Sequence, residues 1–252
     1  MLVAHVSDLH VKSIYYSDEL AENLLDFLTE TNPDILVITG DLTDEGYLHE
    51  YVEAHRFIRR LRAKNKVIVP GNHDSRNMGY KLFEEFFGTR QPIFEKDWLK
   101  IVGVDSSEPD VDDGNIGMDV YGLIKKEFDE FDGIKVFALH HHLIPIPGTG
   151  RERNIPADSG DVLELLMELG VNLVLSGHKH VPWIWKLNEM LIVNAGTATT
   201  LRIKGRIPSS FNLIEIKDDG TISIELVRTK DLKVEEKYRD SLESGKILLK
   251  LH

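Results

Sequence analysis

The chain has 252 residues with 30 Lys and Arg, 42 Asp and Glu, 11 His and no Cys, which gives a formal net charge of −12. A chain without Cys cannot form a disulfide framework, a zinc finger, an iron–sulfur cluster or a thiol nucleophile. The acidic balance disfavours coating of nucleic acid by bulk charge, although a nuclease could still recruit phosphate through local cations. The single Gln and the abundance of Lys and Glu favour a thermophilic source.

The N-terminal sequence predicts the compartment. It has neither the basic n-region nor the long apolar run of a signal peptide. No apolar run approaches the ~20 residues that a membrane-spanning helix needs. We therefore expect a cytoplasmic protein without a membrane partner.

Apolar periodicity predicts strands that alternate with helices in the first half of the chain. The expected strands cover 2–6, 35–39, 67–69, 92–95 and 98–104, and the expected helices cover 17–30, 47–61 and 79–87. In the second half we expect helices over 121–131 and 161–169, and strands over 134–139, 171–175, 183–187, 190–194, 211–216 and 221–228. The last four strands follow one another without helices, and 218–220 is a hairpin turn between the final two.

This order of elements predicts an α/β fold, a four-layer α-β-β-α sandwich of two mixed β-sheets flanked by helices. The sequence has no obvious linker and no internal repeat, so residues 1–230 are expected to form one domain. Residues 231–252 are expected to be a C-terminal extension of that domain, as a helix or a strand, or a contact in a homodimer.

Five clusters of polar residues each follow directly after a predicted apolar strand. They are Asp8-Leu9-His10, Gly40-Asp41-Leu42-Thr43-Asp44, Gly71-Asn72-His73-Asp74, His140-His141-His142 and Gly177-His178-Lys179-His180. Each cluster alone could be an ordinary turn in which Gly and Asn supply positive φ. Ligands of open α/β sheets bind beyond the carboxyl ends of the strands, so the five clusters together predict one shared site.

The residue types in these clusters select a kind of metal. Carboxylate, imidazole and amide oxygen without thiolate suit Mn, Fe, Zn, Ni or Co. These ligands exceed what one ion usually takes, so we expect two divalent transition-metal ions that share a carboxylate, with manganese as the first candidate. Such a pair forms a clamp for phosphoryl transfer.

In their order along the chain, the motifs Asp-x-His, Gly-Asp-x-x-Asp, Gly-Asn-His-Asp, His and Gly-His-x-His resemble the calcineurin-like metallophosphoesterase superfamily. The His run at 140–142 with the prolines after it looks most similar to the branch that includes class III cyclic-nucleotide phosphodiesterases. The resemblance implies that the first metal is held by Asp8, His10 and His180. It implies that Asn72, His140 and His178 hold the second metal, and that Asp41 bridges the two.

The same resemblance implies that a metal-activated hydroxide attacks the phosphoester while His73 acts as general acid to the leaving oxygen. It implies that Asp44 pairs with His73 and fixes its tautomer. Asp74 is interpreted instead as a structural turn residue. His141 and His142 are expected to support the metal ligands or to face the substrate.

The loops around this rim are expected to choose the substrate. Arg151 or Arg153, in the segment 144–158, could grip a second phosphate or a base, or could be solvated. The acidic segment 108–118 could repel a polyanion or could be mobile.

Phosphodiester hydrolysis is the favoured function, with a nucleotide, a nucleic acid or another phosphoester as the partner. The alternatives are a nuclease acting on DNA or RNA and a broad phosphomonoesterase. A metal-binding scaffold protein of the same fold is the non-enzyme alternative. Scaffold relatives typically lack the catalytic His, whereas His73 is present here.

Overall fold

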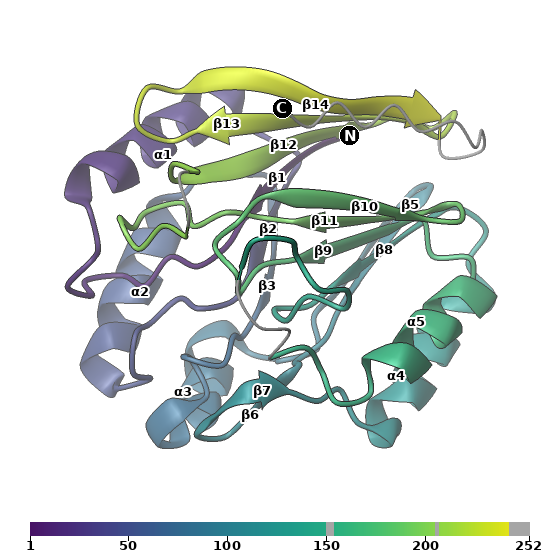
Figure 1. Ribbon diagram of the computed structural model, residues 1–252, viewed down its shortest axis with the longest axis horizontal. Helices are drawn as coiled ribbons and strands as arrows, with labels where there is room; N and C mark the ends of the chain where they lie inside the picture. Colours follow the sequence, from purple (N-terminus) through teal and green to yellow (C-terminus); the bar gives the residue numbers. More distant parts are fainter. Residues whose placement is uncertain (150–153, 205–206, 242–252) are drawn as a thin grey trace.

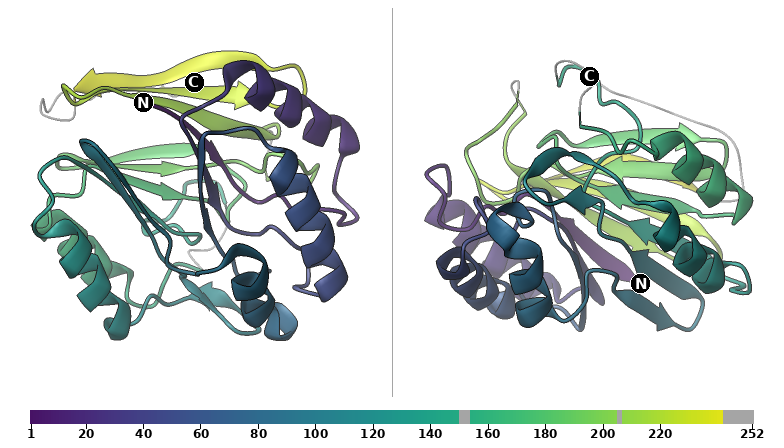
Figure 2. Two further views of the ribbon diagram at one scale, coloured as in Figure 1. Left: turned by 180° about the vertical axis from the view of Figure 1, so that it is seen from behind. Right: turned by 90° about the horizontal axis from the view of Figure 1, so that it is seen from below.

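Two six-stranded mixed β-sheets pack face to face, and helices cover their outer faces (Figures 1 and 2). The computed structural model describes residues 1–149, 154–204 and 207–241. On one side lie α1 (Asp18–Thr31), α2 (Leu48–Arg60) and α3 (Gly79–Phe87), and on the other lie α4 (Met118–Phe128) and α5 (Ser159–Glu168). The predicted α-β-β-α sandwich is therefore confirmed.

The first sheet joins the beginning of the chain to its C-terminal strands. Its order is β14 (Lys233–Ser241), β13 (Thr221–Arg228), β12 (Ser210–Ile216), β1 (Leu2–Val6), β2 (Ile35–Thr39) and β3 (Asn65–Val69). The three strands β1, β2 and β3 are parallel neighbours. The remaining strands β12, β13 and β14 extend the sheet by antiparallel pairing.

The second sheet is built from the middle of the chain. Its order is β10 (Trp183–Leu187), β11 (Met190–Asn194), β9 (Leu173–Ser176), β8 (Ile134–Ala138), β5 (Leu99–Gly103) and β4 (Ile93–Lys96). The strands β5, β8, β9 and β11 are parallel, and both edge strands are antiparallel to their neighbours. A small separate hairpin is formed by β6 (Ser107–Glu108) and β7 (Val111–Gly114).

Apolar side chains fill the three spaces between the four layers. The helices α1, α2 and α3 bury residues such as Leu24 and Phe57 against the first sheet, while Phe128 of α4 and Leu166 of α5 pack on the second. Strand residues of both sheets form the cluster between the sheets. All five residues of β2 are buried, because a strand covered on both faces cannot alternate between apolar and polar residues.

The helix boundaries follow local signals where those signals are strong. Ser17 caps α1 by accepting a hydrogen bond from the backbone N–H of Leu20, as its sequence position predicts. By contrast, α4 begins three residues before the expected 121 and ends at Phe128. Its first turn follows Gly117, whose φ of 83° gives the chain a sharp entry that periodicity does not reveal.

Two segments left open by the sequence have regular structure. The acidic segment 108–118 contains the second strand of the β6–β7 hairpin. The segment after 231 continues into β14, which pairs with β13 along the edge of the first sheet. In the described stretches 1–149, 154–204 and 207–241, no helix is long and apolar enough to cross a membrane.

The two sheets are in close contact where β1 and β9 end. Gly177 follows β9, and a methyl group at its Cα would lie 1.8 Å from Ser7 Oγ and 2.7 Å from Asp8 Oδ2. Only a residue without a side chain fits between these ends. Glycine at this position is therefore a packing requirement of the fold.

We predict that Gly177→Ala lowers the free energy of unfolding by about 1–3 kcal/mol, the usual cost of overpacking a closed interior. The matched control is Gly160→Ala in α5, where an added methyl group meets nothing within 4 Å. Urea unfolding followed by circular dichroism compares the two. Equal stability of Gly177→Ala and the unchanged protein would contradict this account of the sheet contact.

Candidate metal centre

Five strand ends bring their polar residues to one edge of the sandwich. Asp8 and His10 follow β1, Asp41 follows β2, Asn72 and His73 follow β3, His140 follows β8, and His178 and His180 follow β9. Of these eight side chains, all but the half-buried His178 are buried. The parallel pairing of β1 with β2 and β3, and of β8 with β9, places their carboxyl ends together.

Hydrogen bonds across the sheets hold this edge together. The backbone N–H of His178 donates to Asp8 Oδ2 at 3.0 Å. His140 Nδ1 lies 2.7 Å from the carbonyl oxygen of Thr39, an acceptor that fixes a proton on Nδ1 and turns Nε2 toward Asp41 and Asn72. Second-sheet residues are thereby positioned by the end of the first sheet.

A first cluster of donor atoms surrounds Asp8 and His180. Asp8 Oδ1 lies 3.2 Å from His180 Nε2, and His180 Nε2 lies 3.4 Å from His10 Nε2. His10 Nε2 is in turn 3.6 Å from Asp41 Oδ2. Among the described residues, Asp8 Oδ1 is buried without a hydrogen-bond donor. An orphaned carboxylate oxygen facing imidazole nitrogens is the arrangement that a cation satisfies.

A second cluster uses the same oxygen of Asp41. His140 Nε2 lies 3.4 Å from Asp41 Oδ2, 3.1 Å from Asn72 Oδ1 and 3.1 Å from His178 Nδ1. His178 Nδ1 and Asn72 Oδ1 are 3.0 Å apart. Metal–ligand bonds of about 2.0–2.2 Å leave neighbouring ligand atoms roughly 3.0–3.6 Å apart, so both clusters have the spacing of a coordination shell.

The backbone at these ligands is unusual. Five of the seven predicted metal ligands have positive φ: Asp8 (54°), His10 (40°), Asp41 (52°), His178 (69°) and His180 (56°). Outside glycine this left-handed conformation costs energy and concentrates at functional sites. The turns after β1, β2 and β9 are therefore shaped to aim side chains rather than to minimise backbone energy.

Electrostatics within the cluster separate charged from neutral groups. Burial opposes ionisation of Asp41, but the nearby His140 and His73 outweigh it and hold the pKa of that carboxyl well below its usual value. Burial also disfavours a charged His140, yet the charge and hydrogen bonding of Asp41 raise the pKa of His140 to about 9. Burial and the neighbouring His141 lower the pKa of His178 well below its usual value, so this imidazole is neutral and available as a ligand.

His73 is held mainly by the backbone of Asp44. Its Nδ1 lies 2.5 Å from the Asp44 carbonyl oxygen and 3.8 Å from Asp44 Oδ1. The Asp44 carboxylate is closer to His10, with Oδ1 at 3.3 Å from Nδ1. The expected pairing of Asp44 with His73 is thus made mainly by the Asp44 carbonyl oxygen. The Asp44 carboxylate lies between the imidazoles of His73 and His10 and is closer to His10.

Asp74 has the contacts of a structural turn residue. It accepts hydrogen bonds from the backbone N–H groups of Gly71, Leu42 and Thr43, and from the Thr43 hydroxyl. The three bonds from Leu42 and Thr43 tie the turn after β2 to the turn after β3, and the bond from Gly71 closes the latter turn. The carboxylate therefore fixes the relative position of Asp41 and Asn72.

The other two residues of the His run lie behind the ligands. His141 Nδ1 is 2.9 Å from Ser106 Oγ, and its Nε2 is 3.2 Å from the carbonyl oxygen of Asp112. The ring of His142 stacks on that of His178, with centroids 5.8 Å apart. Arg151 and Arg153, predicted as substrate contacts, lie outside the described residues.

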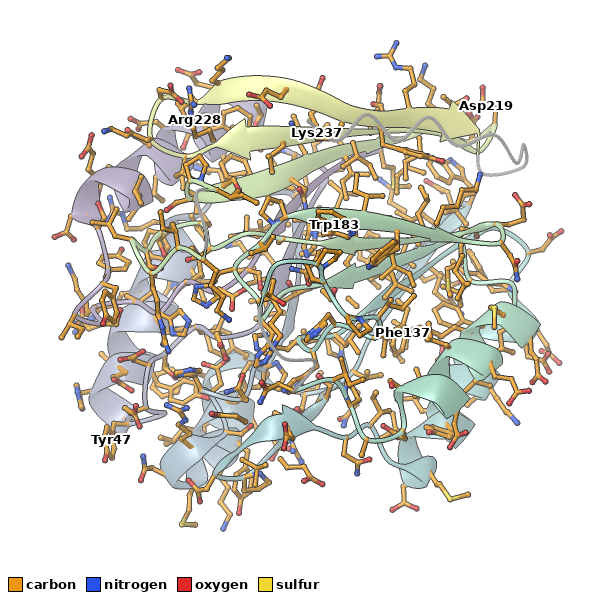
Figure 3. All side chains as sticks on the ribbon, viewed as in Figure 1. Tyr47, Phe137, Trp183, Asp219, Arg228 and Lys237 are labelled. Carbon is orange, nitrogen blue, oxygen red and sulfur yellow. The ribbon has the colours of Figure 1, made fainter. Side chains whose placement is uncertain are left out.

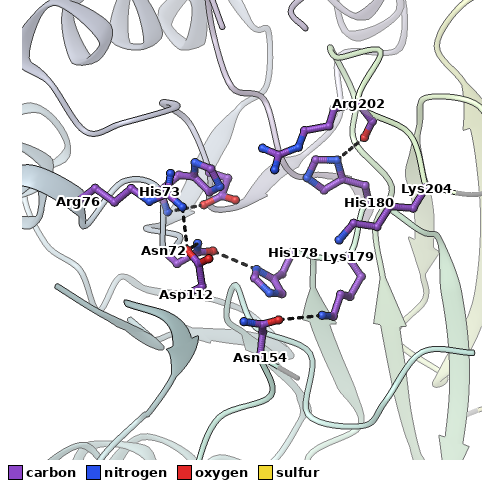
Figure 4. Close-up of a pocket in the computed structure, with 11 residues that line it drawn as sticks. Asn72, His73, Arg76, Asp112, Asn154, His178, Lys179, His180, Arg202 and Lys204 are labelled. Atoms are coloured by element: carbon purple, nitrogen blue, oxygen red, sulfur yellow. Dashed lines mark hydrogen bonds and ion pairs between the residues drawn. The ribbon is translucent and has the colours of Figure 1, made fainter. Parts of the chain in front are cut away.

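A pocket of about 140 Å3 opens onto the two clusters (Figure 4). Asp41, Asn72, His73, His178 and His180 form its inner wall. Six further residues line the pocket, and the sequence analysis did not predict them as site residues: Arg76, Asp112, Asn154, Lys179, Arg202 and Lys204. Arg76 begins a short 3-10 helix, Asp112 lies on the β6–β7 hairpin, and the other four lie on irregular segments. The sequence marked the regions of Asp112, Asn154 and Lys179, but it gave no local signal for Arg76, Arg202 or Lys204.

The Asp112 carboxylate links the hairpin to the metal centre. It accepts hydrogen bonds from Arg76 at 2.7 Å and from the Asn72 amide at 3.1 Å. Because Asn72 Nδ2 is the donor, its Oδ1 is turned toward His140 and His178. The acidic hairpin therefore orients a predicted ligand.

Comparison with known proteins identifies the class. Residues 1–182 match the model of the calcineurin-like phosphoesterase family, so the chain belongs to that family. A Synechococcus protein named "Probable cyclic nucleotide phosphodiesterase" is 23% identical over 195 residues, which cover 77% of this chain and 76% of the relative. A "Probable glycerophosphodiester phosphodiesterase" of Arcobacter nitrofigilis is 27% identical over 216 residues, or 78% of each chain.

Solved structures share the fold at low sequence identity. A dimetal phosphatase from Danio rerio superposes with a TM-score of 0.72 and 11% identity, over 94% of this chain and 98% of that one. A purple acid phosphatase from yellow lupin also gives 0.72, with 14% identity over 94% of this chain. This chain spans 52% of the length of the lupin enzyme. The chain is thus a metallophosphoesterase-family hydrolase with buried His and Asp clusters that could hold divalent ions.

The geometry predicts unequal effects of removing two buried carboxylates. Asp41 Oδ2 belongs to both clusters, so if each cluster binds one ion, Asp41→Ala should reduce bound metal from two ions per chain to nearly none. Asp8 belongs to the first cluster alone, so Asp8→Ala should leave about one ion. Mass spectrometric metal analysis after dialysis measures both, with the exposed turn variant Asp219→Ala as control. Equal losses in the two buried variants would contradict a shared oxygen.

Proposed function

We propose that the protein hydrolyses phosphodiester bonds of small nucleotides, cyclic nucleotides included, at a site of two divalent ions. The observation that carries this proposal is the shared Asp41 oxygen between two donor clusters, with His73 on the wall of the same pocket. The names of the similar proteins point to the same reaction class. We propose residues 1–230 as the catalytic unit.

Each cluster would hold one ion. Asp8, His10 and His180 are proposed for the first, and Asn72, His140 and His178 for the second, with Asp41 as the bridge. Oxygen and nitrogen donors without sulfur suit manganese first and Fe, Zn, Ni or Co next. When bound, such a pair supplies a nucleophile from water near neutral pH and neutralises charge on the phosphoryl oxygens.

His73 is proposed to protonate the leaving oxygen. Its Nδ1–H is committed to the Asp44 carbonyl, which leaves Nε2 to carry the proton that moves. In the reaction, water adds to phosphorus, the bond to the leaving alkoxide breaks, and His73 gives that alkoxide a proton. The proton lost by the attacking water restores the imidazolium. Asp44 acts as a positioning residue for His10 and His73.

The other candidate functions have less support. A nuclease would need to place a long polyanion against a chain with a net charge of −12. A broad phosphomonoesterase would use the same metal centre, so substrate comparison separates it. A scaffold role would not require the proton donor that His73 provides beside the clusters.

We predict the order of substrates that the Mn-loaded protein hydrolyses. Bis-p-nitrophenyl phosphate and 2′,3′- or 3′,5′-cyclic nucleotides should have a higher kcat/KM than p-nitrophenyl phosphate and single-stranded DNA. Absorbance and chromatographic assays at one metal concentration give the comparison. A monoester preference would overturn the proposal in favour of a phosphomonoesterase, and two bound ions without any turnover would favour the scaffold.

We predict that His73→Ala lowers kcat by about 10²–10⁴ for cyclic nucleotides, the usual contribution of a general acid. The loss should be smaller for bis-p-nitrophenyl phosphate, because p-nitrophenolate leaves without protonation. Metal content should remain two ions per chain. His49→Ala, an exposed His at the start of α2, is the control. Full activity of His73→Ala on poor leaving groups would rule out the acid role.

A further inference from the structure

We propose that Arg202 and Lys204, together with Lys179, form a subsite for a second phosphoryl group of the substrate. This inference rests on the proposed phosphodiesterase function and narrows it. The preferred substrate would be a small phosphodiester that carries a further phosphate. None of these three side chains belongs to the predicted metal ligands.

The three cations enter the pocket from one side. Arg202 and Lys204 come from the segment after β11, and their side chains extend toward the space in front of His180 (Figure 4). Lys179 lies between the predicted ligands His178 and His180 and donates a hydrogen bond to Asn154 Oδ1 at 3.3 Å. The phosphoryl group at the metal centre and a second group at these cations would therefore share one cavity.

The segment that carries Arg202 is fastened to the metal centre. The hydroxyls of Thr197 and Thr199 donate hydrogen bonds to the carbonyl oxygens of Asp8 at 2.7 Å and Leu9 at 2.6 Å. His180 Nδ1 lies 2.6 Å from the Arg202 carbonyl oxygen. An anchored backbone lowers the entropy cost of holding a cation in one place, as a binding site requires.

The charges on the pocket wall do not balance. Asp41 and Asp112 are its two acids, whereas Arg76, Lys179, Arg202 and Lys204 are its four bases. Arg76 pairs with Asp112 at 2.7 Å and Lys179 is hydrogen-bonded, so Arg202 and Lys204 are the two wall cations that remain beside Asp41. This excess arises in a chain whose net charge is −12, so it is local.

Neither of the two outer cations has an ion-pair partner in the described part of the chain, although the charge of the Asp44 carboxylate acts on Arg202. Across residues 1–149, 154–204 and 207–241, neither Arg202 nor Lys204 forms an ion pair. The Arg202 guanidinium lies over the ring of Tyr15, 5.9 Å from its centroid. The carboxylates whose charge acts on Lys204 are Asp8 and Asp41, both proposed metal ligands. Divalent cations bound to these carboxylates would cancel their attraction for Lys204. The ammonium group of Lys204 would then be free of nearby negative charge and would favour a bound anion.

A second phosphate fits this surplus better than a neutral group. A simple diester carries one negative charge, which the ions of the proposed metal centre would already neutralise. A guanidinium fork and two ammonium groups match the several oxygens of a terminal phosphate.

Equilibrium binding tests the subsite without turnover of a diester. Isothermal titration calorimetry on the Mn-loaded protein compares adenosine 5′-monophosphate with adenosine 3′,5′-bisphosphate. We expect the bisphosphate to bind at least tenfold more tightly. In Arg202→Gln/Lys204→Gln this advantage should fall below about threefold. Arg62→Gln/Lys217→Gln removes the same charge from exposed positions outside the pocket and should keep the advantage.

A kinetic comparison supplies an independent readout. The ratio of kcat/KM for the dinucleotide pApA over ApA should exceed ten and should fall at least fivefold in Arg202→Gln/Lys204→Gln. Circular dichroism and the single variant Lys204→Gln guard against a folding defect, because the single variant should show a partial loss of the ratio.

The outcomes separate this inference from the proposed function. An unchanged ratio and an unchanged binding advantage in the double variant would overturn the subsite, even if both dinucleotides are hydrolysed. Preferential binding of the bisphosphate that depends on Arg202 and Lys204, without any diester turnover, would support the subsite and refute the phosphodiesterase. Equal binding of both nucleotides to the unchanged protein would also overturn the subsite.

Discussion

The burial of two carboxylates, Asp8 and Asp41, at the edge where the sheets meet is the constraint on which the site depends. Carboxylates in such a place need hydrogen-bond donors and opposite charge. The backbone N–H of His178 satisfies one oxygen of Asp8, and that of His73 satisfies Asp41 Oδ1 at 3.0 Å. The remaining oxygens face imidazoles of both sheets. The glycine at 177 and the cross-sheet bonds keep this edge closed around them.

The sequence predicts that these side chains converge, because the parallel strands position them. Apolar runs identify β1, β2, β3, β8 and β9, and parallel strands necessarily present their carboxyl ends together. Polar residues placed directly after such runs must therefore converge. Topology does not predict side-chain orientation. The Asp44 carboxylate is turned toward His10 instead of His73, and this orientation depends on contacts of a few ångströms.

The outer pocket wall could not be predicted in the same way. Arg202 and Lys204 are single charged residues on an irregular segment, and nothing local distinguishes them from solvated cations. Their place depends on threonine hydroxyls that bind the turn after β1, a contact between positions about 190 residues apart. Asp112 reaches Asn72 from a hairpin that the acidic composition of its segment concealed. The net charge of −12 does not reveal this wall either, because the cations are gathered locally in the pocket.

The positive φ angles at the ligands limit which substitutions this site can tolerate. Asp, Asn and His are the residues other than glycine that enter the left-handed region most readily, and they also donate oxygen or nitrogen to metals. A proposed ligand position such as Asp8 or His178 is thus constrained twice, once by the proposed coordination and once by its backbone conformation. Glutamate also coordinates metals, but it enters the left-handed region less readily than aspartate. Exchange among Asp, Asn and His is therefore the path along which such a centre can change its metal preference while keeping its fold.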